Sequence, residues 1–509
     1  MMPIKKYKLE IVLFIVNAIY MILELIAQRI LSPYFGSTNL VWTSVIGVIL
    51  LSTSVGNYLG GKIADKSKED NQKLEKNIII SIIISGLLVW MIPITQRFFI
   101  TTITSFISNI KIGAIIATLI LFFLPSMFIG TMSPIIIKRK MNKLENVGRT
   151  SGNIYAIATL GSIAGTFLGG FFLVPNFGSN EILFVLSAIL FFLIFFLFES
   201  LDTKPKIELT IIALAMILID VLCFVMFFKN NEKNGEKVKN GDLGVFVNYD
   251  TQYGKVTIYN SKNNMGKMRH LNIDRGHESA TYTEEDKINE LVFEYTKYYD
   301  LMFKSSNQIQ DVLMIGGAGY SYPKYYISHF DNKNIDVVEI DEKITEIAHE
   351  YFYLDKLKKD YNLDEKKRLN IIIQDGRIYL NSNKKKYDAI LNDSFSGDTP
   401  AKTLTTIEAV NRIYNSLKPN GMYLTNIISA LEGEDANFIK AEVKTLKACF
   451  KNVYVIPCRD KNVKDRVQNN MVIATDEALN FEDNVEIDYN NGIFLTDNYC
   501  PIDTLIPRL

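Results

Sequence analysis

The stretch DVLMIGGAG (311–319) decides the fold of the second half of the chain. The apolar run after its aspartate is too short for a helix and leads directly into glycines, which predicts a buried strand that ends in a tight turn. Similar short runs follow, namely IDVVEID (335–341), LNIIIQD (369–375), YDAILND (387–393) and GMYLTNI (421–427). Helical stretches separate most of these runs. This alternation is typical of a parallel sheet covered by helices on both faces.

The carboxyl ends of these strands carry residues that suit a nucleoside ligand. The first strand runs into Gly316, Gly317 and Gly319, whose lack of side chains lets a ligand approach the backbone closely. The second strand ends in Glu339 and Asp341. An acidic residue about 20 positions after a glycine turn is placed to accept the two ribose hydroxyls of a nucleoside. Ligands of parallel sheets bind at this edge, so we expect these residues to form one site.

Two further strand ends complete this set. The third strand ends in Asp375 and Gly376, and the aspartate suits an adenine amino group. The fourth strand ends in Asp393, between Asn392 and Ser394. Capping or turn formation is the alternative role for Asp375 and Asp393. Neither a GxGxxG motif nor the lysine of a phosphate-binding loop is present in the sequence, which disfavours phosphate as the ligand.

The first half of the chain is much more apolar than the second. Seven stretches approach the roughly 20 residues that a membrane-spanning helix needs, and they lie near 9–31, 39–60, 77–96, 112–134, 154–175, 181–199 and 207–228. The first stretch is too long for a cleaved signal peptide and carries Glu24 and Arg29. Lys and Arg are concentrated in the loops on the side of the N-terminus, which predicts a cell-membrane protein with a cytoplasmic N-terminus. If all seven stretches cross the membrane, the second half of the chain lies outside the cytoplasm. If the number of spans is miscounted by one, the second half lies inside.

Some residues within these stretches depart from a plain apolar composition. Gly161, Gly165 and Gly169 recur every four residues, a spacing that lets helix backbones approach each other closely. Asp220 is an ionisable residue within the seventh stretch. Such groups are costly in a lipid environment and are often functional.

These patterns together predict the domain organisation. We expect a multi-pass α-helical membrane domain of about seven spans (1–228), a polar linker (229–242), a β-hairpin subdomain with a helix (243–303) and an α/β Rossmann-like domain (304–509). The hairpin is indicated by two β-rich runs, Lys255–Tyr259 and Met268–Ile273, on either side of an Asn/Gly turn.

The composition excludes several other classes of protein. The chain has 55 Lys and Arg against 55 Asp and Glu, so a nucleic-acid binder that relies on bulk basic charge is excluded. The four histidines have no metal-ligand spacing, and the four cysteines contain no CxxC pair. We therefore expect neither a metal site nor a disulfide framework.

The order of these features resembles the spermidine synthase family, a branch of the class I S-adenosylmethionine-dependent methyltransferase fold. The resemblance is carried by the hairpin, VLMIGGAG (312–319), VVEID (337–341), QDG (374–376) and YDAILND (387–393) with a loop that contains Pro400. Three more motifs are similar to those of the membrane-fused members of the family, namely PYFG (33–36) after Glu24 and Arg29, GRTSGNIYA (148–156) and LTDNYCP (495–501). The resemblance covers nearly the whole chain.

The resemblance also implies a co-substrate and roles for individual residues. The co-substrate would be S-adenosylmethionine or its decarboxylated form, and no metal would take part. Glu339 would bind the ribose, Asp375 would bind the adenine, and the glycine turn would face the methionyl side. Asp393 would correspond to the catalytic carboxylate of the aminopropyl transferases. It would accept a proton from an amine and hold the nitrogen in line with the electrophilic carbon.

The chain departs from the family pattern at four places. Gly319 occupies the position of an aspartate that binds the aminopropyl amine, and Tyr253 is followed by Gly254 where the family has a Tyr-Gln pair. Glu278 lies near the position of an expected Gln, and Asp398 is displaced by two positions from an acidic residue of the family. Because a lost carboxylate weakens recognition of a ligand ammonium, these departures favour methyl transfer from S-adenosylmethionine over aminopropyl transfer to putrescine.

Three hypotheses about function follow from the sequence. The first is an integral membrane transferase that moves a methyl or aminopropyl group to a polyamine, a lipid head group or a membrane-associated peptide. The second is a membrane transporter whose second half senses an adenosyl ligand, and the third is a catalytically degenerate interaction domain. In each case the lipid bilayer is the expected partner, nucleic acid is not, and homo-oligomer formation stays open.

Overall fold

The computed structural model describes residues 7–36, 39–67, 70–107, 109–140, 147–197, 203–396 and 399–507. The chain divides into two compact units. The first comprises Met1–Lys233 with Asn248–Lys255, and the second comprises Asn234–Val247 with Val256–Leu509. The first unit is almost entirely helical, and the second contains the large sheet.

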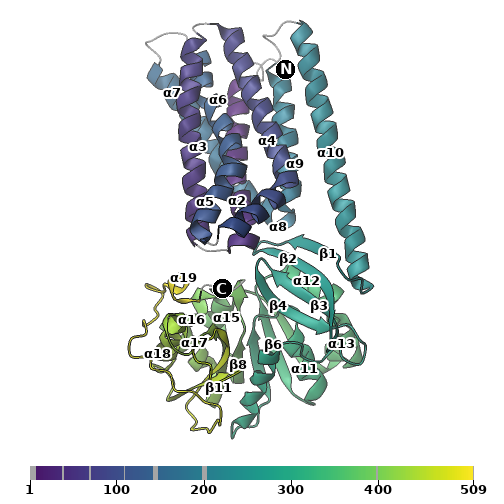
Figure 1. Cartoon of the computed structure of the whole chain (residues 1–509), viewed down its shortest axis with the longest axis vertical. Coiled ribbons are helices and arrows are strands. Elements are labelled where there is room, and N and C mark those ends of the chain that lie inside the picture. The colour runs from purple at the N-terminus through teal and green to yellow at the C-terminus, as the bar shows by residue number, and fades with distance from the viewer. Residues whose placement is uncertain are drawn as a thin grey trace. The chain divides into compact units, whose positions relative to one another are not determined.

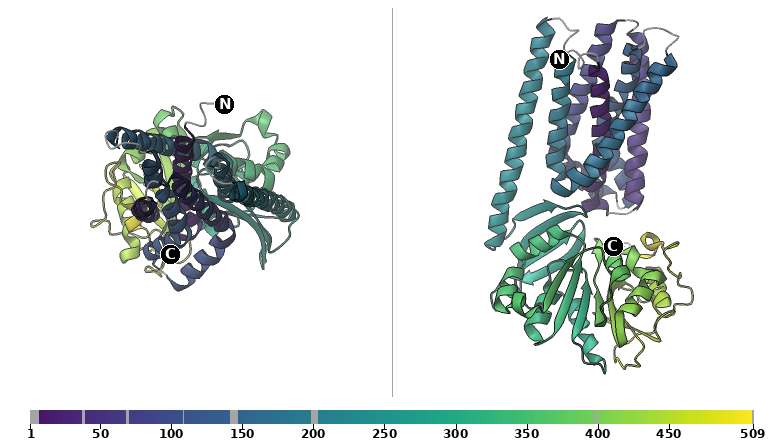
Figure 2. Two further views of the ribbon diagram at one scale, coloured as in Figure 1. Left: turned by 90° about the horizontal axis from the view of Figure 1, so that it is seen from above. Right: turned by 180° about the vertical axis from the view of Figure 1, so that it is seen from behind.

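The helices of the first unit run side by side as a bundle (Figures 1 and 2). They are α2 (Lys8–Phe35), α3 (Asn39–Lys66), α4 (Asn71–Phe106), α5 (Ile110–Thr118), α6 (Leu124–Lys140), α7 (Val147–Phe167), α8 (Val174–Asn176), α9 (Ser179–Leu193) and α10 (Thr203–Lys239). Turns of π-helix join α5 to α6 and α7 to α8. When helices joined by a π-helical turn are counted as one helix, the described residues contain seven helices that are long and apolar enough to cross a membrane. The seven predicted apolar helices are therefore confirmed.

The glycine stripe of α7 packs directly on α2. A Cβ atom on Gly161 would lie 2.2 Å from the carbonyl oxygen of Phe14, and one on Gly165 would lie 2.3 Å from that of Ala18. Both distances are too short for any side chain, so only glycine permits this approach of the two backbones. The predicted packing role of the stripe agrees with this contact.

The predicted polar linker is mostly helical instead. Helix α10 continues to Lys239, and the Nζ atom of Lys239 lies 3.2 Å from a carboxylate oxygen of Glu236, one turn earlier. The Nη2 atom of Arg269 donates to the carbonyl oxygens of Val238 at 2.6 Å and Lys239 at 3.0 Å. Because the last carbonyls of a helix lack partners within the helix, this guanidinium stabilises the end of α10.

A small antiparallel sheet follows α10. Its strands β1 (Phe246–Asp250), β2 (Lys255–Asn263), β3 (Gly266–Ile273) and β4 (Gly276–Tyr282) pair in sequence order. This arrangement confirms the predicted hairpin and adds a strand on each side of it.

The helix expected after the hairpin is a 3₁₀-helix, η6 (Glu294–Lys304). Its buried residues are Thr296, Tyr299 and Met302, spaced by three positions. Three residues per turn is the 3₁₀ period, so this spacing buries one face of η6 where an α-helix would not.

The large sheet of the second unit has seven strands in the order β12-β13-β11-β8-β5-β6-β7. Five of them are parallel, namely β5 (Asp311–Ile315), β6 (Asn334–Glu339), β7 (Leu369–Ile373), β8 (Tyr387–Asn392) and β11 (Leu417–Ser429). The other two, β12 (Asn452–Pro457) and β13 (Gln468–Thr475), are antiparallel and extend the sheet beyond β11. The predicted Rossmann-like parallel sheet is confirmed in its five parallel strands, and the antiparallel pair makes the whole sheet mixed.

Helices connect the strands of this sheet (Figure 1). They are α11 (Ser321–His329), α12 (Glu342–Tyr351), α13 (Leu354–Asp360), α14 (Leu363–Lys366), α15 (Gly376–Ser382), α16 (Lys402–Thr405), α17 (Ile407–Ser416) and α18 (Asn437–Leu446). A further short helix, α19 (Ile502–Leu505), follows the last strand. A short β-hairpin, β9 (Phe395–Ser396) with β10 (Thr399–Pro400), lies between β8 and α16.

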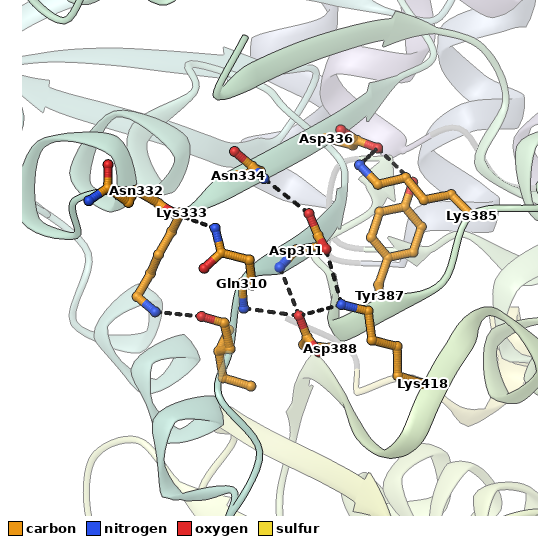
Figure 3. Close-up of polar contacts among 11 residues, drawn as sticks. Gln310, Asp311, Asn332, Lys333, Asn334, Asp336, Lys385, Tyr387, Asp388 and Lys418 are labelled. Atoms are coloured by element: carbon orange, nitrogen blue, oxygen red, sulfur yellow. Dashed lines mark hydrogen bonds and ion pairs between the residues drawn. The ribbon is translucent and has the colours of Figure 1, made fainter. Parts of the chain in front are cut away.

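Charged side chains tie the amino ends of three central strands together (Figure 3). Asp388, at the start of β8, accepts hydrogen bonds from the backbone amides of Gln310 at 2.9 Å and Asp311 at 2.8 Å. The ammonium of Lys418 lies 2.9 Å from Asp388 and 3.0 Å from Asp311. Next to them, Asp336 accepts from Lys385 and Tyr387. These contacts fix the register of the strands at the amino edge of the sheet, and they involve no residue of its carboxyl edge.

Candidate active site

The carboxyl ends of β5 and β8 meet at the point where the strand order reverses. From β5 the chain proceeds to β6 and β7 on one side, and β8 and β11 lie on the other side. Gly316 ends β5 with a φ of +96°, and a Cβ atom there would lie 2.4 Å from the carbonyl oxygen of Asp393. The amide of Asp393 in turn donates to the carbonyl of Ile315 at 2.9 Å. Glycine is therefore required at 316, and this close approach fixes Asp393 beside the glycine turn.

A cavity of about 550 Å³ opens beside this turn. Its walls come from the small sheet, η6 and the ends of β5, β8, β11 and β13, and they include Glu278, Ser279, Glu294, Tyr295, Gly316, Gly317, Asp393, Asn426, Cys458, Arg459 and Asn469. A volume of this size is typical of small-molecule sites. The cavity lies at the switch point, where ligands of such sheets bind.

Asp393 is the best placed proton acceptor in the cavity. The hydroxyl of Tyr295 donates to its Oδ2 atom at 3.0 Å, and the amide of Asn426 approaches its Oδ1 atom at 3.4 Å. Burial raises the pKa of Asp393 to about 6, although these two hydrogen bonds act in the opposite direction. A carboxyl group with such a pKa is ionised at neutral pH and is basic enough to take a proton from a substrate.

The described walls of the cavity carry more negative than positive charge. Glu278, Glu294 and Asp393 are carboxylates, whereas Arg459 is the one lysine or arginine among the lining residues. Burial raises the pKa of Tyr295, and the neighbouring Asp393 and Glu278 raise it further, so Tyr295 stays a neutral donor. An amine or sulfonium ligand fits this environment better than an anion does.

Glu339 stabilises the glycine turn by accepting hydrogen bonds from its backbone amides. Its Oε2 atom accepts from the amides of Gly317 at 2.8 Å and Ala318 at 3.0 Å, and its Oε1 atom accepts from the amide of Asp341 at 3.0 Å. A carboxylate has about four lone-pair positions, so one acceptor position stays available for a ribose hydroxyl. The role of Glu339 in ribose binding stays a prediction, and Glu339 lies outside the described residues that line the cavity.

Other predicted ligand residues act as helix caps. Asp341 accepts from the amide of Lys343 at 3.0 Å and caps α12. Asp375 accepts from the amide of Ile378 at 2.9 Å and caps α15, whose first residue is Gly376. The capping alternative therefore describes both contacts. The binding role of Asp341, Asp375 and Gly376 stays a prediction, and within the described chain these residues lie outside the set that lines the cavity.

The remaining predicted substrate residues are distributed unevenly. Glu278 lines the cavity. Tyr253 belongs to Asn248–Lys255, the segment that groups with the helical unit. Asp398 lies outside the described residues.

Gly319 is enclosed by its neighbours. A Cβ atom there would lie 2.6 Å from the hydroxyl oxygen of Ser279 and 3.0 Å from the Phe352 ring. The hydroxyl oxygens of Ser279 and Ser321 are hydrogen-bonded at 2.9 Å. An aspartate at 319 therefore requires Ser279 to move out of this contact.

Tyr295 and Asn426 are site residues that the sequence did not single out. Asn426 lies near the end of the fifth parallel strand, so the same rule that selected Asp393 could have found it. Tyr295 lies in the 3₁₀-helix within a run of tyrosines and glutamates, and that run has no periodicity that marks one tyrosine as functional.

The fold and the site together define a class of protein. A Rossmann-like sheet, a glycine turn at the switch point and a buried carboxylate in an adjoining cavity are features of nucleoside-binding domains. Residues 296–475 match the family described as the spermine/spermidine synthase domain.

Several known proteins are similar to this part of the chain. A polyamine aminopropyltransferase of Clostridium beijerinckii is 28% identical over 147 residues, which are 28% of this chain and 50% of that protein. One from Prochlorococcus marinus is 25% identical over 229 residues, which are 44% of this chain and 71% of that protein. A probable spermidine synthase from Corynebacterium glutamicum aligns in structure with a TM-score of 0.38 and 20% identity, over 46% of this chain and 81% of its own. The chain spans about half the length of most of the curated relatives it matches.

Proposed function

We propose that this protein is an integral membrane aminopropyltransferase that uses decarboxylated S-adenosylmethionine and an amine acceptor. The observation that carries this proposal is Asp393, a carboxylate beside the glycine turn in a cavity whose walls are predominantly acidic. The family of residues 296–475 and the names of the curated relatives support the same reaction.

In this reaction Asp393 acts as the general base. The acceptor amine donates its proton to Asp393 as the nitrogen lone pair forms a bond to the aminopropyl carbon next to the sulfonium. The carbon–sulfur bond breaks, and its electron pair returns to sulfur to give the neutral thioether methylthioadenosine. Because the donor carbon is already activated, the protein contributes mainly by orienting the amine and accepting its proton. Tyr295 holds the carboxylate in place for this transfer.

The donor would be held by the glycine turn and the strand ends. We assign Glu339 to the ribose, Asp375 to the adenine and Gly316–Gly319 to the sulfonium side. Glu278 faces the same cavity and supplies a carboxylate for the ammonium groups of donor or acceptor.

Methyl transfer from S-adenosylmethionine is the second candidate. Gly319 favours it, since this position carries no carboxylate to repel the α-carboxylate of that donor. The acidic walls favour the decarboxylated donor instead, and this is why we place aminopropyl transfer first.

The seven apolar helices would anchor this reaction in the cell membrane with the N-terminus in the cytoplasm. We propose a small amine as the acceptor, ahead of a lipid head group or a membrane-associated peptide. A single cysteine introduced at the exposed Asn240 and treated with an impermeant thiol reagent in intact cells reports the side of the second unit. Labelling in intact cells places it outside, and labelling only after lysis places it inside.

The reaction itself is tested with the purified full-length protein. Each donor is incubated with a panel of amines, and the nucleoside product is identified. Methylthioadenosine supports aminopropyl transfer, S-adenosylhomocysteine supports methyl transfer, and the absence of both refutes a transferase. Asp393→Asn should abolish turnover and retain donor binding, whereas Asp331→Asn at an exposed position should retain both.

A further inference from the structure

Asp220 is a buried carboxyl group halfway along α10. It is 2% exposed, whereas its neighbours Leu218 and Leu222 are 60% and 54% exposed. Most of this part of α10 therefore faces away from the other helices of the unit, and the Asp220 side chain faces toward them. The function proposed above does not use this residue.

The hydroxyl of Ser187 on α9 connects this carboxyl group to α4. The Oγ atom of Ser187 lies 3.1 Å from the Oδ2 atom of Asp220 and 3.1 Å from the carbonyl oxygen of Gly86. Ser187 is fully buried. The other oxygen of Asp220, Oδ1, is also buried and has no hydrogen-bond partner among the described residues.

No charged side chain of these three helices lies close to the carboxyl group. On α9 the nearest is Glu181, six residues before Ser187, which is about 9 Å along the helix axis. On α4 the nearest are Lys76 and Arg97, and on α10 they are Glu208 and Lys229, all nine or more residues from the contact. The thiol of Cys223 lies closer on α10. An ionised carboxylate at this place would therefore be buried without a countercharge, which is strongly unfavourable.

The hydrogen atoms at this contact also favour the protonated form. A serine hydroxyl has one hydrogen to donate. If Asp220 were ionised, its oxygen and the carbonyl of Gly86 would compete for that hydrogen. If Asp220 is protonated, the carboxyl donates to Ser187 and Ser187 donates to Gly86, so both 3.1 Å contacts are hydrogen bonds.

We propose that Asp220 is a proton-binding site of the helical unit, which holds α10 against α9 and α4 through the relay Asp220–Ser187–Gly86. Release of the proton leaves two acceptors for one donor, so the continuous relay between α10 and α4 is broken. Protonation of this carboxyl group therefore controls how firmly α10 is attached to the bundle.

Infrared spectroscopy of the full-length protein in nanodiscs tests the proton directly. The wild type should show the carbonyl stretch of a protonated carboxylic acid at neutral pH. Asp220→Asn should reduce the intensity of that band, and Asp65→Asn, at a side chain that is 82% exposed on α3, should leave it unchanged. Ser187→Ala should keep the band and move it to higher frequency, because the acid loses its hydrogen-bond acceptor. An unchanged spectrum in Asp220→Asn overturns the proposal.

Thermal unfolding provides the second measurement. The folded wild type holds a proton that the unfolded chain releases, so its stability should fall as the pH rises above the range in which an ordinary aspartate ionises. Asp220→Asn can still donate to Ser187 and should lack this part of the slope, and Asp65→Asn should retain it. A slope shared by all three proteins, or a stability that depends on sodium instead of pH, contradicts proton binding.

Discussion

Replacing Tyr295 by Phe should raise the pH at which the proposed transferase becomes active. The Tyr295 hydroxyl donates to ionised Asp393 at 3.0 Å, and burial already raises the pKa of that carboxyl group to about 6. A hydrogen bond to a charged group contributes roughly 1.5–3 kcal/mol. Since one pKa unit corresponds to about 1.4 kcal/mol, loss of this bond should raise the pKa by about 1–2 units. At pH 6.5 the ionised fraction of Asp393 should fall on the order of tenfold, and at alkaline pH it should recover.

The assay is the pH dependence of kcat/KM for formation of methylthioadenosine. The acid limb reports the essential base of the free enzyme, so its midpoint should move from about 6 to about 7–8 in Tyr295→Phe. The control is Tyr298→Phe, because that hydroxyl donates to the carbonyl of Cys458 at 3.3 Å and not to Asp393. An unmoved midpoint, or an equal loss of activity at every pH, would show that Tyr295 does not stabilise the ionised base.

Three further predictions test other contacts of the second unit. Gly319→Asp should destabilise the protein by about 1–3 kcal/mol, because the new Cβ atom would lie 2.6 Å from the Ser279 hydroxyl oxygen. A double variant that also carries Ser279→Gly should recover part of this loss in thermal unfolding. If the single and double variants unfold at the same temperature, crowding at position 319 is not the cause of the destabilisation. Asp388→Asn should lower the free energy of unfolding in urea by about 1–3 kcal/mol, because it weakens two hydrogen bonds to backbone amides and the ion pair with the half-exposed Lys418. The affinity for the donor should stay unchanged. A selective loss of donor binding would contradict this structural role. Arg269→Gln should expose the end of α10 to limited proteolysis, because the amide cannot reach all the carbonyls that the guanidinium contacts, and an unchanged cleavage rate would contradict the capping role.

Much of the fold could be predicted because the decisive patterns are local. Short apolar strands that end in glycine or aspartate gave β5, β6, β7 and β8 directly, and the long apolar stretches gave the seven helices. The antiparallel pair β12 and β13 was not predicted, since its pairing partners are set by the tertiary fold and not by the adjacent sequence. The helical state of 229–239 was missed for a related reason. It depends on Arg269, which is distant in sequence and contacts the last carbonyls of α10.

The site was predicted to a lesser extent. Strand ends selected Asp393 and the glycine turn, and the structure places them side by side because parallel strands bring these positions together. The same rule selected Asp375, whose carboxylate accepts from the amide of Ile378 and caps the following helix. Tyr295 could not be found in this way, because it reaches Asp393 from a separate 3₁₀-helix, and only the folded chain shows which of several tyrosines does so.

The division of the large sheet into two edges has a consequence for how this domain evolves. Asp388, Lys418 and their partners tie the amino ends of the strands, and none of these side chains lines the cavity (Figure 3). Substitutions at the carboxyl edge therefore leave the contacts that hold the strand starts in register intact. Gly319, where the chain departs from the pattern of its family, follows β5 at that freer edge. Residues at the carboxyl edge, and with them the substrate specificity, can therefore change during evolution without loss of the contacts that stabilise the fold.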